Sequence, residues 1–539
     1  MNFDFYNVIA GLAVLLSISA LLLDLKRSLM MLQQNSYRNE RYFRWLNESG
    51  DSTSYSRIIA ILIAMSGMIH FIPLDYTIIA AILFSIYLIF KQSRQKYKKP
   101  LVFTKRAIRI YSVAIVIALA VLAGSYVYES SNCSWAKSHG LFGVTVAAQA
   151  LIAASFVVIA VANFILIPIE KIINRRYYND AKKRLEAMPD LKIIGVTGSY
   201  GKTSTKHYLH RILSEHFDTM MTPGSFNTTM GVVRTVREHL QPYNEVFIVE
   251  MGAKQKGDIE EICRLVKPQM GIVTAVGEQH LETFHSIENV QATKFELVDS
   301  LPADGLAVVN NDFPFIANRK VDNVECVRYA VNAIENVDFT ATNIQYDATG
   351  TQFAIVGKGV ELSLHTRLLG ECNVSNLIAA VIVAVRLGVP EDKIRYAVEH
   401  IEQVEHRLNM KRTPAGITII DDAYNSNPHG SKMAVDVLSS MTSGKRIIIT
   451  PGMIELGIQQ YDRNRELGEH IAQKVDVAIV VGQYNRDAIM EGIESVKKPT
   501  EGFESHTVDS FAEAQVLLAK IAKAGDTVLY ENDLPDTFK

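Results

Sequence analysis

The hydrophobic positions divide the chain into two unlike parts. Five apolar runs crowd the first third, at about 5–23, 58–72, 76–90, 108–126 and 144–167. The first, fourth and fifth approach the roughly 20 apolar residues that a helix needs to cross a bilayer. The second and third are shorter and are separated only by Pro73, Leu74 and Asp75, which predicts a tight helical hairpin. We therefore expect a membrane region with about five transmembrane helices in residues 1–185.

The basic residues between these runs predict their orientation. Lys and Arg are dense between the first and second runs, between the third and fourth, and after the fifth, whereas Lys137 is alone after the fourth. Cytosolic loops carry such an excess, so we expect a multi-pass protein of the cytoplasmic membrane with everything after about residue 168 in the cytosol. The first run could be a signal peptide, but no basic residue precedes it and no small-residue cleavage site ends it. The runs contain almost no ionisable residues, with His70 as the exception, so an anchor or a lipid-contacting platform is favoured over a transport pathway.

From Leu191 onward, short apolar runs alternate with amphipathic stretches. Strands are predicted at 192–196, 245–250, 271–276 and 305–310, with helices at 257–266 and 287–301. This alternation predicts an α/β domain whose parallel sheet is covered on both faces. Ligands of such sheets bind at the carboxyl ends of the strands, so the candidate site residues are sought there.

A glycine turn follows the first of these strands, in the segment 193–204 (IIGVTGSYGKTS). Gly198 and Gly201 allow the backbone to bend so that its N–H groups face one point, and the next helix directs its positive end there. Lys202 adds a positive charge, and Thr203 offers a hydroxyl to Mg²⁺. Val196 stands where a full Walker motif has glycine. A glycine-rich turn without a ligand is the alternative, but Gly, Lys and Thr in this order after an apolar strand favour phosphate binding.

A carboxylate and an imidazole follow two further strands, which we expect to be neighbours in this predicted sheet. Glu250 ends the strand at 245–250, and His280 comes shortly after the strand at 271–276. Both would reach the phosphate-binding loop and could hold a divalent metal together with Thr203. Alone, Glu250 could cap a helix and His280 could be an ordinary loop residue.

These motifs carry a resemblance to a known family. The segments 197–203 (TGSYGKT), 224–231 (GSFNTTMG), 250–252 (EMG) and 280–286 (HLETFHS) resemble the central domain of the Mur ligases, the ATP-dependent amide-bond ligases of peptidoglycan precursor synthesis. The resemblance continues through 370–380 (GECNVSNLIAA), Arg407 and 421–428 (DDAYNSNP), and covers about residues 190–530. The last motif is most similar to the MurF branch, which joins D-alanyl-D-alanine to the precursor tripeptide.

The resemblance implies roles for individual residues. Lys202, His280 and Lys294 would be catalytic, and Thr203, Glu250, His280 and Lys294 would hold Mg²⁺, Lys294 as a carbamate because an ammonium cannot ligate a cation. A surface lysine on a helix is the alternative for Lys294. The residues that would bind ATP are Gly198, Ser199, Gly201, Lys202, Thr203, Ser204, Asn376, Arg407, Asp422, Tyr424 and Asn425. The implied partners are a nucleotide, a cell-wall precursor acceptor, an amino acid or dipeptide, and membrane lipid.

The region around Arg407 reads as a linker. The stretch 403–416 is charged and ends in Pro-Ala-Gly, and strands are predicted after it at 417–420, 446–450, 475–481 and 527–530. We therefore expect a P-loop parallel-sheet ATPase domain at 186–412 and a Rossmann-like α/β domain at 413–539 that could close over the nucleotide. A net charge of −2 gives no nucleic-acid signal, and four scattered cysteines indicate neither a disulfide framework nor a metal site.

Three features depart from an ordinary MurF. Five apolar runs replace the domain that grips the UDP-sugar acceptor, the segment 450–457 (TPGMIELG) lacks the aspartate of the family's G-D-M-x-E-L-G, and 529–538 (LYENDLPDTF) replaces a lysine-glycine-serine-arginine segment. A lipid-linked acceptor is therefore one hypothesis. The alternatives are an amino-acid ligase for a non-wall acceptor, similar to folylpolyglutamate synthases, an idle membrane scaffold for wall assembly, and, most weakly, an ATP-driven transporter.

Overall fold

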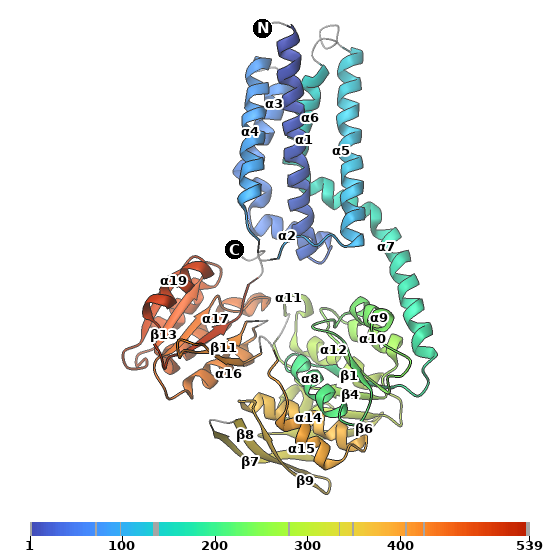
Figure 1. Ribbon diagram of the computed structural model, residues 1–539, viewed down its shortest axis with the longest axis vertical. Helices are drawn as coiled ribbons and strands as arrows, with labels where there is room; N and C mark the ends of the chain where they lie inside the picture. The colour runs from blue at the N-terminus through green and yellow to red at the C-terminus, as the bar shows by residue number, and fades with distance from the viewer. Residues whose placement is uncertain are drawn as a thin grey trace. The chain divides into compact units, whose positions relative to one another are not determined.

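The computed structural model describes residues 3–69, 73–97, 99–132, 140–278, 281–333, 335–347, 350–404, 407–423 and 426–534. Its contacts divide the chain into two compact units (Figure 1). Of the described residues, those up to Asn174 form unit 1 together with Leu534, and unit 2 is Arg175–Asp533. The predicted boundaries at 185 and 412 stay predictions.

Unit 1 is a bundle of helices with one short 3-10 turn, η1. Its elements are α1 (Phe3–Gln34), α2 (Asn39–Glu48), η1 (Asp51–Thr53), α3 (Tyr55–Ile69), α4 (Leu74–Arg94), α5 (Lys105–Asn132), α6 (Gly140–Ala153) and the part of α7 (Ser155–Glu186) up to Asn174. Five helical segments in the described residues are long and apolar enough to cross a membrane by length and composition, namely those in α1, α3, α4, α5 and α7. The second and third apolar runs form α3 and α4, which pack against each other as the predicted hairpin requires.

The fifth apolar run is not one helix, as the sequence had suggested. The chain breaks at Ala154, so the run 144–167 is divided between α6 and α7. α6 has 14 residues and packs against α1, α3 and α5 (Figure 1). Hydrophobicity alone cannot reveal this break, because both sides of it are equally apolar.

Unit 1 also contains buried charges that lie just beyond the apolar runs. Arg57, which is 4 % exposed, contacts Asp51 at 3.0 Å and lies 3.7 Å from Asp24. Arg27 pairs with Asp51, and Gln92 donates to Asp24 at 2.9 Å. Because α1 and α3 extend past the apolar runs, these side chains become part of the bundle interior, which the sequence pattern did not predict.

The first sheet of unit 2 has nine strands in the order β2-β3-β1-β4-β5-β6-β7-β8-β9. All neighbours are parallel up to β7, and β8 and β9 are antiparallel. The predicted parallel sheet is thus extended by an antiparallel edge that the sequence analysis missed. The strands are β1 (Lys192–Thr197), β2 (Thr219–Met221), β3 (Val246–Glu250), β4 (Met270–Val273), β5 (Leu306–Asn310), β6 (Glu325–Ala330), β7 (Phe339–Asp347), β8 (Gly350–Gly357) and β9 (Val360–Thr366).

Helices cover both faces of this sheet, as predicted. On one face, β-branched and leucine side chains of the strands pack against α8 (Lys202–Leu213), α14 (Glu371–Arg386) and α15 (Glu391–Glu399). On the other face they pack against α9 (Thr229–Glu238), α10 (Asp258–Val266) and α12 (Ile287–Asp299). Two short helices complete this part, α11 (Leu281–Phe284) and α13 (Pro314–Ala317).

The second sheet has six strands in the order β10-β11-β15-β12-β13-β14, and all are parallel except β10. Its strands are β10 (Asn409–Arg412), β11 (Thr418–Asp422), β12 (Arg446–Thr450), β13 (Val477–Val481), β14 (Glu504–Val508) and β15 (Thr527–Glu531). The helices that pack on it are α16 (Pro428–Ser439), α17 (Gln460–Lys474), α18 (Arg486–Ser495) and α19 (Phe511–Ile521), with a 3-10 turn η3 (Gly457–Gln459) before α17.

Candidate active site

The loop between β1 and α8 has the backbone conformation that the glycines predicted. Gly201 has φ +76°, a left-handed conformation that favours glycine, and a Cβ there would collide with the side-chain oxygen of Asn376. A Cβ at Gly198 would collide with the hydroxyl of Thr274. Both glycines are therefore required by close approach as well as by the turn.

Lys202 lies across the mouth of this loop. Its Nζ atom donates hydrogen bonds to the carbonyl oxygens of Gly198, at 2.7 Å, and Ser199, at 3.1 Å. Burial lowers the pKa of Lys202 to about 8. The Ser199 hydroxyl is held at the loop after β4, where it donates to the carbonyl oxygen of Gly277 at 3.0 Å. Thr203 and Ser204 occupy the first turn of α8, at the positive end of its dipole.

Asn376 reaches this loop from α14, which packs against α8. Its Oδ1 atom accepts a hydrogen bond from the Thr205 hydroxyl at 3.1 Å, next to Gly201. Three residues earlier on α14, Asn373 accepts from the Tyr208 hydroxyl at 2.7 Å. Two asparagines therefore fix α14 against α8, and one of them borders the phosphate-binding loop.

Glu250 is buried at the end of β3 and has a partner that the sequence analysis did not identify. Its Oε2 atom lies 3.0 Å from Nζ of Lys206, and its Oε1 atom accepts from Asn227 at 3.0 Å. Burial acts to raise the pKa of Glu250, but the charges of Lys206 and Lys202 outweigh it, and the pKa is lowered. The carboxylate is therefore ionised. A lysine one helical turn after Lys202, on the inward face of α8, was the signal that could have revealed this pair.

The strand order corrects one part of the predicted geometry. We expected Glu250 and His280 at the ends of neighbouring strands, but β3 and β4 lie on opposite sides of β1. The phosphate-binding loop after β1 is therefore between them. His280 lies outside the described residues, as do Tyr424 and Asn425. Within the described part of the chain, no three His, Cys, Asp or Glu side chains gather as a metal site would require.

Lys294 is 2 % exposed, which excludes the alternative of a surface lysine on α12. Burial, together with the positive charge of Lys202, holds its pKa well below the usual range. Lys202 and Lys206 both act on the buried Glu250 carboxylate, and Lys202 also acts on Lys294. An excess of positive charge in one interior site is expected where the natural ligand is an anion.

Arg407 and Asp422 come together where β10 and β11 begin and end. The backbone N–H of Leu408 donates to the Asp422 carboxylate at 3.1 Å. Burial raises the pKa of Asp422 to about 7, although the charge of Arg407 opposes this shift. Two predicted nucleotide contacts, Arg407 in the linker and Asp422 at the end of β11, are therefore close to each other.

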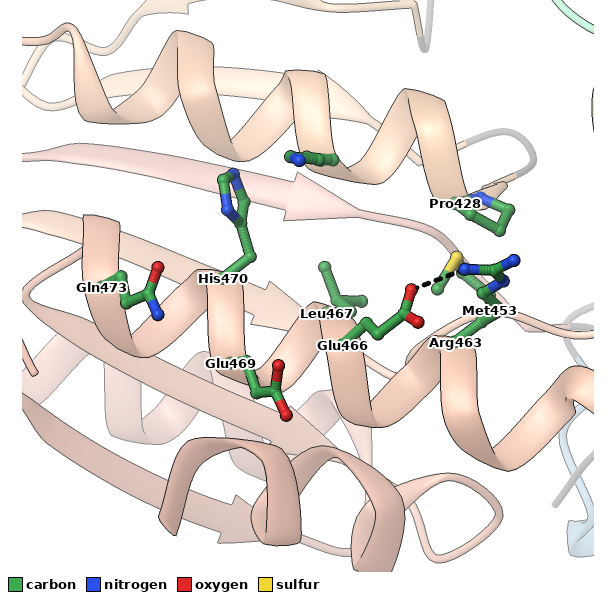
Figure 2. Close-up of a pocket in the computed structure, with 9 residues that line it drawn as sticks. Pro428, Met453, Arg463, Glu466, Leu467, Glu469, His470 and Gln473 are labelled. Carbon is green, nitrogen blue, oxygen red and sulfur yellow. Dashed lines mark hydrogen bonds and ion pairs between the residues drawn. The ribbon is translucent and has the colours of Figure 1, made fainter. Parts of the chain in front are cut away.

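A cleft of about 280 Å³ lies between α16 and α17 (Figure 2). Its walls include Pro428, Met453, Arg463 and His470, and Arg463 pairs with Glu466 at 2.8 Å. Arg463 also pairs with Glu278 at 2.6 Å, in the loop that holds the Ser199 hydroxyl. The ring of Tyr200, in the phosphate-binding loop, stacks on His429 with the centroids 5.8 Å apart.

The end of β15 carries an acidic residue where MurF enzymes have a basic, substrate-binding segment. Glu531 is 1 % exposed and accepts hydrogen bonds from the hydroxyls of Ser426, Ser431 and Thr450. Asn532 donates to the carbonyl oxygen of Gly452 at 2.6 Å. A carboxylate satisfied by three hydroxyls therefore ties β15 to the MurF-like segment 421–428 and to the segment 450–457, where the sequence departs from MurF.

Comparisons with known proteins agree with this geometry. The Mur ligase middle domain matches residues 196–384, and the Mur ligase, glutamate ligase domain matches 406–530. The UDP-N-acetylmuramoyl-tripeptide–D-alanyl-D-alanine ligase of Bacillus subtilis is 30 % identical over 346 residues, which are 63 % of this chain and 72 % of the relative. The chain belongs to the Mur ligase family.

Further relatives place this Mur ligase near the MurF enzymes. The ligase of the same name from Escherichia coli is 32 % identical over 300 residues, 54 % of this chain and 65 % of the relative. A crystal structure of MurF from Acinetobacter baumannii has a TM-score of 0.60 and 26 % identity, and covers 67 % of this chain and 77 % of that one. The Thermotoga maritima MurF ligase in complex with ADP shares the fold, with a TM-score of 0.59. The chain thus spans about two thirds to three quarters of these proteins.

Proposed function

We propose that this Mur ligase is an ATP-dependent amide-bond ligase of the MurF type, anchored in the cytoplasmic membrane, with its ligase domains in the cytosol. The single observation that carries the proposal is a glycine loop of the phosphate-binding conformation, beside which Lys202 and Lys206 act on the buried, ionised carboxylate of Glu250. Such a site suits the transfer of a phosphoryl group to a carboxylate, which an amine then attacks.

The residues present fit ATP and Mg²⁺. The loop residues Gly198–Ser204 would hold the phosphates, which Arg407 would reach from the linker. Asn376 would contact the nucleotide, and Asp422, Tyr424 and Asn425 would approach the ribose and adenine. The Thr203 hydroxyl and the ionised Glu250 carboxylate are oxygen donors of the kind that Mg²⁺ prefers, and His280 would complete the set. When bound, Mg²⁺ supplies positive charge to the phosphate oxygens.

The chain's own side chains supply the rest of the chemistry. Lys202 leaves the carbonyl oxygens of Gly198 and Ser199 and donates to phosphate oxygens instead, which offsets the charge that develops on them. Burial and the charge of Lys202 lower the pKa of Lys294 well below its usual range, which favours the neutral amine; a neutral amine adds to CO₂ and loses a proton to give the carbamate that would act as a metal ligand. Lys206 keeps the Glu250 carboxylate ionised and fixed.

The acceptor and the amine follow from the relatives. Their name specifies a UDP-N-acetylmuramoyl tripeptide and D-alanyl-D-alanine, and we propose both as first candidates for this chain. The apolar helices occupy the place of the family's UDP-sugar domain, so we propose a lipid-linked form of the precursor as the preferred acceptor. Buried Glu531, in place of a basic segment, favours a second candidate, in which the amine is not D-alanyl-D-alanine.

The experiment is a substrate panel. The detergent-solubilised full chain receives ATP, Mg²⁺, a UDP-linked or a lipid-linked tripeptide, and either D-alanyl-D-alanine or other amines, while phosphate release is followed. We expect release only when acceptor and amine are both present, and faster turnover with the lipid-linked acceptor. Equal turnover with the two acceptors would contradict the lipid-linked proposal. Phosphate release with an acceptor and another amine, but not with D-alanyl-D-alanine, would establish the second candidate.

A further inference from the structure

The break between α6 and α7 is held by specific polar contacts. Arg57 donates to the carbonyl oxygen of Ala153, at 3.1 Å, and to the hydroxyl of Ser155, at 3.0 Å. The Ser155 hydroxyl in turn donates to Asp24. A guanidinium therefore caps the negative end of α6, and the residue that begins α7 is fixed to α1. These contacts hold the break at Ala154, so α7 does not continue the path of α6.

The first half of α7 then crosses one end of the bundle. Asn163 donates to the carbonyl oxygen of Tyr37 at 3.0 Å and to the side chain of Asn39 at 2.8 Å, both in the segment that follows α1. Glu170 pairs with Arg109, in the first turns of α5, at 2.7 Å. The segment after α1 and the start of α5 both lie at the end of the bundle that the basic loops assign to the cytosol. The first half of α7 therefore lies across the cytosolic end of the bundle (Figure 1).

The two faces of this part of α7 differ. Ile159, Ala162, Asn163, Leu166 and Glu170 are buried against the bundle. The opposite face exposes large apolar side chains at helical spacing, with exposed fractions of 41 % for Val157, 43 % for Val161, 68 % for Phe164, 50 % for Ile165 and 57 % for Ile172. Three exposed basic residues follow on the same helix, Lys171, Arg175 and Arg176.

We propose that the first half of α7 is an interfacial helix, which lies in the cytosolic leaflet with its exposed apolar face in the lipid. This proposal rests on the proposed membrane anchoring. The bilayer is the fitting occupant because the apolar face is continuous with helices of spanning length, and because basic residues at its end match anionic headgroups. The fifth span is then α6 alone, whose 14 residues cover about 21 Å and leave the bilayer locally thin. The helix would hold the ligase domains beside the leaflet that carries a lipid-linked substrate.

Depth measurements on the full chain test this. Val157→Cys, Val161→Cys and Ile165→Cys, which all precede Pro168, are spin-labelled in a background whose natural cysteines are alanine. The protein is placed in vesicles of phosphatidylethanolamine and phosphatidylglycerol, and label depth is read from accessibility to oxygen and to a water-soluble nickel chelate. Ile79→Cys, Leu83→Cys and Phe90→Cys on the lipid-exposed face of α4 serve as the spanning control.

An interfacial helix gives the same shallow depth at all three α7 positions, while the α4 labels span about 16 Å at a rise of 1.5 Å per residue. A gradient of about 12 Å along the α7 labels overturns the proposal, as does a water-exposed signal at all three. If the α4 labels are also water-exposed and show no depth gradient, the result contradicts the membrane anchoring and not the interfacial helix alone. If the cysteine-free background does not fold, tryptophan at the same positions and quenching by brominated lipids give the same depths.

Discussion

The Nζ atom of Lys206 lies 3.0 Å from Oε2 of Glu250, and both side chains are fully buried. This pair sits directly behind the phosphate-binding loop, because Lys206 is one turn along α8 from Lys202. A buried carboxylate that remains ionised supplies negative charge to Lys206 and Lys202. The pair therefore serves both the stability of the domain and the charge of the site, and the two roles can be separated.

Glu250→Gln should destabilise the protein by about 3 kcal/mol, because it leaves the Lys206 ammonium buried without a counter-charge. Adding Lys206→Met removes that charge and should restore most of the loss in urea unfolding. Phosphate release should remain abolished in both variants. As a control, Glu238→Gln breaks the exposed pair with Arg234 and should cost below about 0.5 kcal/mol. Recovered turnover in the double variant would show that Glu250 has no direct part in the reaction.

Gly201→Ala should weaken nucleotide binding at least about 10-fold, because its Cβ would displace Asn376 from the loop. Gly359 is the matched control, since its φ is +79° and nothing lies within 4 Å of a Cβ added there. Gly359→Ala should cost about 1 kcal/mol of stability and leave nucleotide affinity unchanged. Calorimetric titration with ADP measures the affinity of both variants. Equal losses of affinity would show that the contact between residue 201 and Asn376 does not matter for nucleotide binding.

Lys294 should carry a carbamate when the protein is supplied with carbon-13-labelled bicarbonate. Burial and the charge of Lys202 lower the pKa of Lys294, which favours the neutral amine that can attack CO₂. The labelled carbamate signal should appear in the NMR spectrum of the wild type and of the exposed-lysine control Lys192→Met, but not in Lys294→Met. Lys294→Met should also lower turnover by about 100-fold. A carbamate signal that survives in Lys294→Met would assign the modification to another lysine.

Asp422 should make stability fall as pH rises. Burial raises its pKa from 3.8 to about 7, so between these values the folded chain keeps a proton that the unfolded chain releases. The stabilising contribution is present below pH 3.8 and is lost as pH rises through 7. Relative to wild type, Asp422→Asn should therefore gain on the order of 4 kcal/mol of stability between pH 4 and pH 8. A difference between the two proteins that does not change with pH would contradict the raised pKa.

Much of this architecture could be predicted because local patterns determine it. The strands at 192–196 and 446–450 are continuous apolar runs, and the glycines at 198 and 201 mark a turn that few other residues can make. The break at Ala154 could not be predicted, because it depends on Arg57 and Asp24, which are distant in sequence. The Lys206–Glu250 pair was missed for the same reason, since helix and strand meet only in the folded sheet.

Ligation by this protein should require Lys202 of the phosphate-binding loop. Lys202→Ala in the full chain tests it most directly, with phosphate release and ligated product measured in parallel with complementation of a strain that lacks the protein. We expect turnover to fall about 1,000-fold, complementation to fail, and the unfolding transition to remain cooperative. Full complementation by a variant that no longer turns over ATP would contradict the claim and leave a scaffold as the function of this protein.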